Sequence, residues 1–260
     1  MNNIIEFQIL QFFSIYLLLI IVLFIMKKCR INKTKLLFIS SFKMSIQLFL
    51  AGLILTYILK NPQPIFTIIY LIIMISFSIY QVISKNKNIN IKFKIIIAIS
   101  MTISILFVIS YFIYIVIGEN IFNPQYVIPI SGMIVGNTMT GILLGLKNFQ
   151  ENILLEKSKI NTLICIGVAP NKIIMEFVKK ALETAMLPTI NSMIAMGIIS
   201  LPGMMTGQIL SGTLPITAIL YQISIIIAIC TSVTSASFLS LYLGSKTLYN
   251  TNTQTFNENF

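Results

Sequence analysis

Seven apolar stretches, separated by short polar segments, recur along this chain of 260 residues. A helix needs about 20 predominantly apolar residues to cross a bilayer, and the stretches are close to that length or above it. They cover residues 7–26, 38–59, 65–83, 95–117, 126–146, 187–210 and 218–243. Because 57% of the residues are hydrophobic and only 10% are charged, the sequence predicts an all-α, polytopic integral membrane protein with one transmembrane domain over residues 1–260.

The residue types that the chain lacks exclude most enzymes. It contains no His, Asp or Trp, and its seven acidic residues are all Glu. Ser-His and Cys-His catalytic pairs, HExxH zinc sites and Asp-rich calcium loops cannot be built from this set. Cys29, Cys165 and Cys230 lie far apart and form no CxxC pair, which favours packing roles over a disulfide or zinc site. We therefore expect no catalytic residues in this chain.

The basic residues that give the chain its net charge of +11 are distributed as expected for a membrane protein with alternating loops. Sixteen of the 18 Lys and Arg residues lie in segments 27–37, 84–94 and 147–186 or at position 246, and the loops on the other side carry only Lys60. The positive-inside rule then predicts seven crossings, an outside amino terminus and a cytoplasmic carboxyl terminus in the cell membrane. A nucleic-acid-binding surface would not follow this alternation, so lipid is expected around the chain and nucleic acid is not expected as a partner.

One basic residue, Lys43, falls inside the second stretch. Ser40, Lys43 and Gln47 share a helical face. The ammonium group either extends to the nearby interface or faces a polar pore or a partner, because a charge in hydrocarbon is costly.

Small residues at four-residue intervals predict close helix packing in two stretches. The fifth contains Gly132-xxx-Gly136 and Gly141-xxx-Gly145. The seventh carries a longer row, made of Ala228, Ser232, Ala236, Ser240 and Gly244. Small residues let helix backbones approach each other in lipid, where no hydrophobic force drives association. The rows serve either packing within one subunit or a homodimer seam or moving interface.

The segment 147–186 is predicted to be cytoplasmic and helical. Residues 150–166 and 171–186 show apolar residues at helical spacing, and Gly167-Val-Ala-Pro170 forms a turn between them with Pro170 suited to a first helical turn. Such a hairpin either lies on the membrane surface or presents its turn to a cytosolic partner.

Residues 188–222 differ from an ordinary membrane span. Pro202-Gly203 and Gly207 interrupt the apolar run, and polar side chains gather on its predicted outer side. Broken helices persist at membrane depth only where the freed backbone groups face protein or a water-filled cavity. The segment therefore forms part of a translocation path or, alternatively, a plain extracellular loop.

Four motifs resemble one family of membrane proteins. PQYVIPISGMIVGNTMTGI (124–142), GVAP (167–170), LPTINSMIAMGIISLPGMMTGQILSG (187–212) and YQ (221–222) are similar to the FetB-type ABC transporter permeases, which include bacterial iron exporters and plant aluminium-tolerance proteins. The resemblance covers about residues 124–245. It implies a permease that pairs with itself and with two copies of a cytosolic ABC ATPase subunit. Gly167, Val168, Ala169 and Pro170 would then couple the chain to the ATPase.

The chain's own motifs agree with a separate source of energy. It has no GxxxxGK[ST] phosphate loop, and the nearest string, GILLGLKN (141–148), has the wrong spacing. We expect no cofactor on this chain and ATP only on the partner subunit. The resemblance implies a substrate path through family-motif residues, namely Asn137, Thr138, Asn191, Met204, Met205, Thr206, Gln208 and Gln222.

The substrate itself stays open at this point. The resemblance implies export of iron or another metal ion, but iron prefers carboxylate and imidazole ligands, which the predicted spans lack. The adjacent thioethers of Met204 and Met205 suit a softer, copper-like ion. A chelated metal or an organic solute such as a nucleotide sugar is an alternative. A stand-alone secondary transporter and a structural anchor are two further alternatives.

Overall fold

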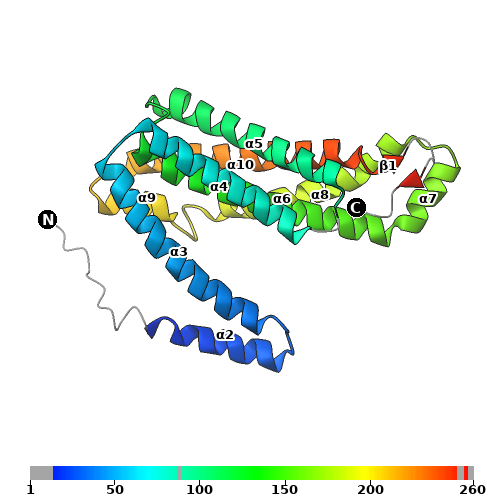
Figure 1. Cartoon of the computed structure of the whole chain (residues 1–260), viewed down its shortest axis with the longest axis horizontal. Coiled ribbons are helices and arrows are strands. Elements are labelled where there is room, and N and C mark those ends of the chain that lie inside the picture. The colour runs from blue at the N-terminus through cyan, green and yellow to red at the C-terminus, as the bar shows by residue number, and fades with distance from the viewer. Residues whose placement is uncertain (1–13, 87–88, 251–254, 257–260) are drawn as a thin grey trace. The chain divides into compact units, whose positions relative to one another are not determined.

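The computed structural model describes residues 14–86, 89–250 and 255–256, and it divides the chain into two compact units that meet at Asn61 and Pro62. The first unit contains α2 (Leu17–Lys28) and α3 (Thr34–Lys60) (Figure 1). The hydroxyl groups of Tyr16 and Ser45 form a hydrogen bond between the start of α2 and the middle of α3. Part of the first predicted stretch, 7–26, lies outside the described residues.

The second unit is a helical bundle. Its elements are α4 (Pro64–Lys85), α5 (Ile91–Tyr111), the π-helix η1 (Phe112–Ile117), α6 (Pro124–Leu155), α7 (Lys157–Cys165), α8 (Pro170–Ala195), α9 (Gly203–Leu210) and α10 (Pro215–Ser245). After α10, two-residue strands β1 (Tyr249–Asn250) and β2 (Thr255–Phe256) pair in antiparallel register.

Proline and asparagine define where these helices begin. α4, α6, α8 and α10 all start with a proline, whose fixed φ suits the first turn and whose missing N–H would have no helical partner there. The side chain of Asn90 accepts a hydrogen bond from the backbone N–H of Lys92, and that of Asn123 accepts one from Gln125. Both asparagines therefore cap the helices that follow them.

Five helices among the described residues are long and apolar enough to cross a bilayer. They are α3, α4, α5 continued by η1, α6 and α10. This composition and architecture confirm the predicted all-α polytopic membrane protein.

Helix α10 lies at the centre of the second unit. It packs against α5, α6 and α8, and α6 packs in addition against α4 and α8 (Figure 1). The largest fully buried side chains in the bundle include Phe93, Phe149 and Phe177. The rings of Phe93 and Phe149 meet edge to face at 6.5 Å between centroids, which ties α5 to α6.

The helix boundaries in the second half of the chain correct the predicted ones. Helix α6 continues through the predicted start of the hairpin as far as Leu155, so only Lys157–Cys165 form a separate helix. Helix α8 runs from Pro170 to Ala195 without interruption, and the predicted boundary at 186 falls inside it. The sixth stretch is therefore not one interrupted span. Its first part is the end of α8, and the chain turns at 196–202 before α9 begins.

Candidate functional site

The turn between α7 and α8 has the geometry of a Schellman motif. The N–H of Gly167 donates to the carbonyl of Ile164 (2.9 Å), and the N–H of Val168 donates to that of Leu163 (3.0 Å). Gly167 adopts the left-handed conformation that this motif needs, with φ of 84°. Val168 packs against the hydrophobic core, whereas Gly167 and Ala169 are exposed. Pro170 then begins α8, so the four predicted coupling residues form one tight turn whose tip is open.

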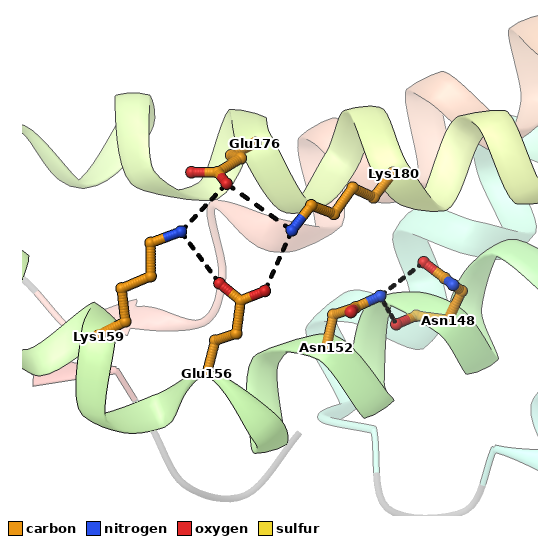
Figure 2. Close-up of polar contacts among 6 residues, drawn as sticks. All are labelled: Asn148, Asn152, Glu156, Lys159, Glu176 and Lys180. Carbon is orange, nitrogen blue, oxygen red and sulfur yellow. Dashed lines mark hydrogen bonds and ion pairs between the residues drawn. The ribbon is translucent and has the colours of Figure 1, made fainter.

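Four charged side chains form a ring of ion pairs that joins α7 and the bend before it to α8 (Figure 2). Glu156 stands at the bend between α6 and α7, Lys159 lies on α7, and Glu176 and Lys180 lie on α8. Lys159 Nζ is 3.1 Å from both Glu156 and Glu176, and Lys180 Nζ is 3.0 Å from Glu156 and 3.7 Å from Glu176. Each charge has two neighbours of opposite sign. The ring therefore holds α7 against the start of α8.

The ring changes the protonation of two of its members. The pKa of Glu156 is lowered, first by the hydrogen bond from Lys180 and then by that from Lys159. The pKa of Lys159 is raised by its hydrogen bonds to Glu156 and Glu176. Both shifts favour the charged forms of Glu156 and Lys159.

The end of α6 adds a further local contact beside this ring. Asn152 Nδ2 donates hydrogen bonds to the backbone carbonyl (2.9 Å) and to the side-chain oxygen (2.8 Å) of Asn148 (Figure 2). These hydrogen bonds link two successive turns of α6 just before the bend at Glu156.

Gly141 and Gly145 lie at the closest approach of three helices. A Cβ atom on Gly141 would be 2.6 Å from Val233 Cγ1 of α10 and 3.1 Å from the carbonyl oxygen of Ala185 in α8. A Cβ atom on Gly145 would be 3.2 Å from the carbonyl oxygen of Ala181 and 3.5 Å from Leu241 Cδ1. The order of these contacts along the chain shows that α8 runs antiparallel to α6 and that α10 runs parallel to it. We call this junction the glycine seam.

The row of small residues on α10 is buried along its whole length. Ala228, Ser232, Ala236, Ser240 and Gly244 are each at most 8% exposed. A Cβ atom on Gly244 would lie 1.8 Å from Cε2 of Phe93, so the aromatic ring of α5 rests directly on this glycine. The row packs inside the bundle.

The other glycine pair of α6 has no such neighbours. A Cβ atom on Gly132 would be 3.4 Å from the flexible end of Met74, and one on Gly136 would have nothing within 4 Å among the described residues. Asn137, the next residue along α6, is exposed and donates to the carbonyl of Met133 (2.8 Å). This part of the helix presents an open polar face.

Thr138 lies on the opposite side of α6 from this open face. Its hydroxyl forms a 2.8 Å hydrogen bond with the hydroxyl of Ser232 on α10, and both residues are fully buried. Thr138 therefore joins two helices inside the bundle, whereas its neighbour Asn137 faces outward.

A turn that contains Gly197 follows the end of α8. Gly197 has a φ of 83°, and the carbonyl of Ala195 accepts hydrogen bonds from the N–H groups of Ile199 (2.9 Å) and Ser200 (3.2 Å). Pro202 then precedes the first residue of α9, and Gly207 lies inside that helix. The break thus begins six residues before the predicted Pro202-Gly203 interruption, because Met196 already leaves the helical conformation, with φ of −65° and ψ of 136°, and Gly197 follows in the left-handed region.

Most of the predicted path residues on this segment are half-buried. Met204 and Met205 fall in the first turn of α9, and Met204 packs against the core. The hydroxyl of Thr206 donates to the carbonyl of Gly203 (2.9 Å). Asn191, one turn before the end of α8, is exposed.

Gln222 connects the break to the central helix. It is 8% exposed, and its Nε2 donates to the sulfur of Met196 at 3.9 Å, which links α10 to the last turn of α8. Its Oε1 and the buried Oε1 of Gln208 have no hydrogen-bond partner among the described residues. Gln208 and Gln222 thus lie on α9 and α10, two helices that pack against each other, whereas Asn137 lies on α6.

The depth of the break follows from the helix register. Gly141 opposes Ala185 and Gly145 opposes Ala181, so Met196 is level with Ile130, about 25 Å along α6 from Lys147 at 1.5 Å per residue. The hydrocarbon core of a bilayer is about 30 Å thick. The break and the ring of charges thus lie at opposite ends of the bundle.

Sequence reasoning missed two features of the bundle. The ring was not predicted, although Glu156–Lys159 and Glu176–Lys180 are pairs of opposite charge at i,i+3 and i,i+4 spacing. Sequence reasoning also missed η1, which carries no Pro or Gly before Gly118. An apolar groove of about 370 Å³ lies between η1 and α10. The hydroxyls of Ser224 and Thr231 in that groove donate to carbonyls of α10 itself, so the groove suits hydrocarbon.

No cluster of three or more His, Cys, Asp or Glu side chains placed to hold a metal occurs in the described part of the chain. The polar groups near the break are amide, hydroxyl and thioether groups.

Comparison with known proteins places this geometry in context. The sequence profile of the uncharacterised protein family UPF0014 matches residues 9–249. The UPF0014 membrane protein YjkA of Bacillus subtilis (strain 168) is 28% identical over 207 residues, 80% of this chain and 82% of that protein. The probable iron export permease protein FetB of Escherichia coli (strain K12) is 27% identical over 80% of each chain.

A plant protein is also similar over part of its length. The Arabidopsis thaliana protein ALUMINUM SENSITIVE 3 is 35% identical over 135 residues, 52% of this chain and 50% of that protein. No solved structure gives a significant match.

Proposed function

Since the chain belongs to the UPF0014 family of membrane proteins, we propose that it is the permease subunit of an ABC transporter that exports iron or another metal ion. The similarity to the probable iron export permease FetB, which extends over 80% of both chains, carries this proposal. In it, the chain forms a homodimer in the cell membrane, and a separate cytosolic ATPase subunit binds and hydrolyses ATP.

The hairpin supports the ATPase contact. Its tip, Gly167–Pro170, projects an exposed glycine on a turn whose shape is fixed by two backbone hydrogen bonds. The ring of Glu156, Lys159, Glu176 and Lys180 holds α7 on α8, so a load on the turn is transmitted to the bundle. The hairpin lies on the cytoplasmic side in this proposal, because segment 147–186 carries six of the basic residues.

Helix α8 supplies the mechanical link. It is one uninterrupted helix from Pro170 at the turn to Ala195 at the break. A displacement of the turn by the ATPase therefore reaches Met196 and Gln222 through one continuous helix, whose single internal proline, Pro188, is the place where it can bend. Closure of the ATPase dimer would shift α8 along the glycine seam and switch the polar break between inward and outward access.

The test is affinity purification of the tagged chain from its native membrane. We expect an ABC ATPase to co-elute, and Gly167→Trp to abolish its recovery. Gly197→Trp is the matched control, because Gly197 has nearly the same φ and equally open surroundings at the other end of α8. Elution of the intact chain without an ATPase, or equal recovery with both variants, would contradict the proposal.

A second candidate substrate is a chelated metal or an organic solute such as a nucleotide sugar. The donor set near the break favours the chelated metal over a bare iron ion, since amide, hydroxyl and thioether groups are poor ligands for a bare iron ion. Cells that lack the chain should accumulate iron or another metal under the first candidate. They should keep normal metal content and accumulate the solute if the substrate is an organic solute, and they should accumulate the metal together with its chelator if it is a chelated metal.

A further inference from the structure

Gln222 presents a buried hydrogen-bond acceptor that the protein does not use. More than nine-tenths of the residue is buried, and its amide nitrogen is fixed by the sulfur of Met196 at 3.9 Å. With the nitrogen engaged, the oxygen Oε1 points elsewhere and has no partner among the described residues. Burial of an unpaired carbonyl oxygen costs free energy that a bound donor would recover.

The surroundings of Gln222 have a definite electrostatic character. Met196 is the residue that ends α8, and the carboxyl end of a helix carries partial negative charge. The buried Oε1 of Gln208, on α9, is a second acceptor without a partner among the described residues. Residues 184–245 contain no Lys, Arg or Glu. The segment that carries both acceptors, from the end of α8 to α10, therefore supplies no basic side chain.

We propose that Gln222 Oε1 is the inner contact of a binding site for a cation that donates hydrogen bonds, either a hydrated metal ion or an ammonium group. The site rests on the proposed transport function, because it lies at the break in the predicted path. It excludes phosphorylated solutes, since a phosphate group needs donors and positive charge, and this site offers acceptors. Gln222 would touch the ligand directly, whereas Met196 acts as a positioning residue through the Gln222 amide.

The experiment measures binding by titration calorimetry to the full chain, with its ATPase if one co-purifies, in nanodiscs of zwitterionic lipid. The probes are Fe²⁺, ethanolamine and inorganic phosphate at neutral pH. Fe²⁺ tests the hydrated metal and ethanolamine tests the ammonium group. The variants are Gln222→Met, which keeps the length of the side chain but removes the acceptor, and Gln222→Glu, which keeps the acceptors and adds a negative charge. Gln125→Met is the matched control at an exposed glutamine.

We expect at least one cation to bind the wild-type chain, and phosphate not to bind. Gln222→Met should weaken the cation about tenfold or more, as expected for a lost hydrogen bond to a charged group. Gln222→Glu should bind the cation at least as tightly as the wild type, and Gln125→Met should bind it equally well.

Several results would overturn the site. They are binding of phosphate, failure of both cations to bind the wild-type chain, unchanged affinity in Gln222→Met, and loss of cation binding in Gln222→Glu with a native melting temperature. If Gln222→Met does not fold, binding of the three probes to the wild-type chain and cation binding by Gln222→Glu still test the site. Co-elution of an ATPase together with any of these results would reject the site and leave the permease assignment intact.

Discussion

Helix α6 carries the same Gly-xxx-Gly spacing twice, and the two copies have different surroundings. A Cβ atom on Gly141 or Gly145 would touch the backbone carbonyl of Ala185 or Ala181, whereas one on Gly136 would have no neighbour within 4 Å among the described residues. The difference comes from the partners, since α8 presents two alanines to the second pair. The spacing shows only that a helix can be approached closely. A small residue on the facing helix decides where the approach takes place.

The largest effect expected from this comparison is that of Gly141→Leu. The first carbon of the new side chain would already lie 2.6 Å from Val233 Cγ1 and 3.1 Å from a backbone carbonyl, and the rest of the leucine has no room. We expect a loss of about 3 kcal/mol or more in the free energy of unfolding, at the upper end of overpacking effects. Unfolding in mixed detergent micelles, followed by circular dichroism, measures it.

Gly136→Leu is the matched control on the same helix. It introduces the same side chain at the same spacing, and it should change the free energy of unfolding by less than about 0.5 kcal/mol, as at other open positions. Equal losses at the two positions would mean that the glycine seam is not where α6 is closely packed.

A smaller and more specific effect is expected for Gly141→Ala. One methyl group at this position should cost about 1–3 kcal/mol because it overlaps Val233. Val233→Ala removes the overlapping atoms, so the double variant should be more stable than the sum of the two single effects. Strict additivity in this cycle would show that the two residues are not in contact.

The Thr138–Ser232 hydrogen bond should contribute less than the seam. Thr138→Val keeps the shape of the side chain and removes the hydroxyl, and polar pairs between transmembrane helices average about 0.6 kcal/mol in coupling energy. A cycle with Ser232→Ala, measured in the same micelles, should return a coupling of that size. A coupling of zero would mean that the two hydroxyls do not bond to each other.

Much of the bundle could be predicted from its residues. Apolar stretches of about 20 residues locate α3, α4, α5 and α10, and a proline marks the start of four helices. These signals are local, so they can be read without the fold. The row of small residues from Ala228 to Gly244 can be recognised in the sequence in the same way, but the residues that pack against it cannot.

The errors in the helix boundaries have a common cause. Residues 171–186 are amphipathic and carry charges, whereas residues 187–195 carry none, and this change of pattern predicts a boundary inside α8. The backbone does not follow the pattern, because a change in the environment of the helix surface need not end the helix, and α8 continues even through Pro188. At the other end, Pro202 is a strong breaking signal, yet the extended conformation of Met196 had already ended the helix.

The candidate site was less predictable than the fold, because its parts meet only through packing. Gln222 and Met196 are 26 residues apart, and their contact depends on the break that brings the end of α8 beside α10. Glu156 and Lys180 are 24 residues apart and meet only because α7 folds back on α8. Neither pair has a sequence spacing that signals it.

The glycine seam and the ring of charges hold the same helix, α8, by different means. Packing contacts in the seam are fixed by shape, whereas the four side chains of the ring are partly exposed to solvent and respond to pH and salt. The hairpin should therefore loosen under conditions that leave the seam intact. Mobility of the hairpin can be measured as the fluorescence anisotropy of a dye on Cys165, which is exposed on α7, after Cys29→Ser and Cys230→Ser.

The smallest expected effect is the pH dependence of this mobility. The pKa of Glu156 is lowered below its ordinary value of 4.5, so its contribution is present above that value and is lost as the pH falls through the folded-state pKa. We expect constant anisotropy from neutral pH down to about pH 5 and a fall at more acid values. Glu156→Gln should lower the anisotropy already at neutral pH. Glu183→Gln, which removes a carboxylate outside the ring, should behave like the wild type, and a wild-type chain with no acid transition would mean that Glu156 does not anchor the hairpin.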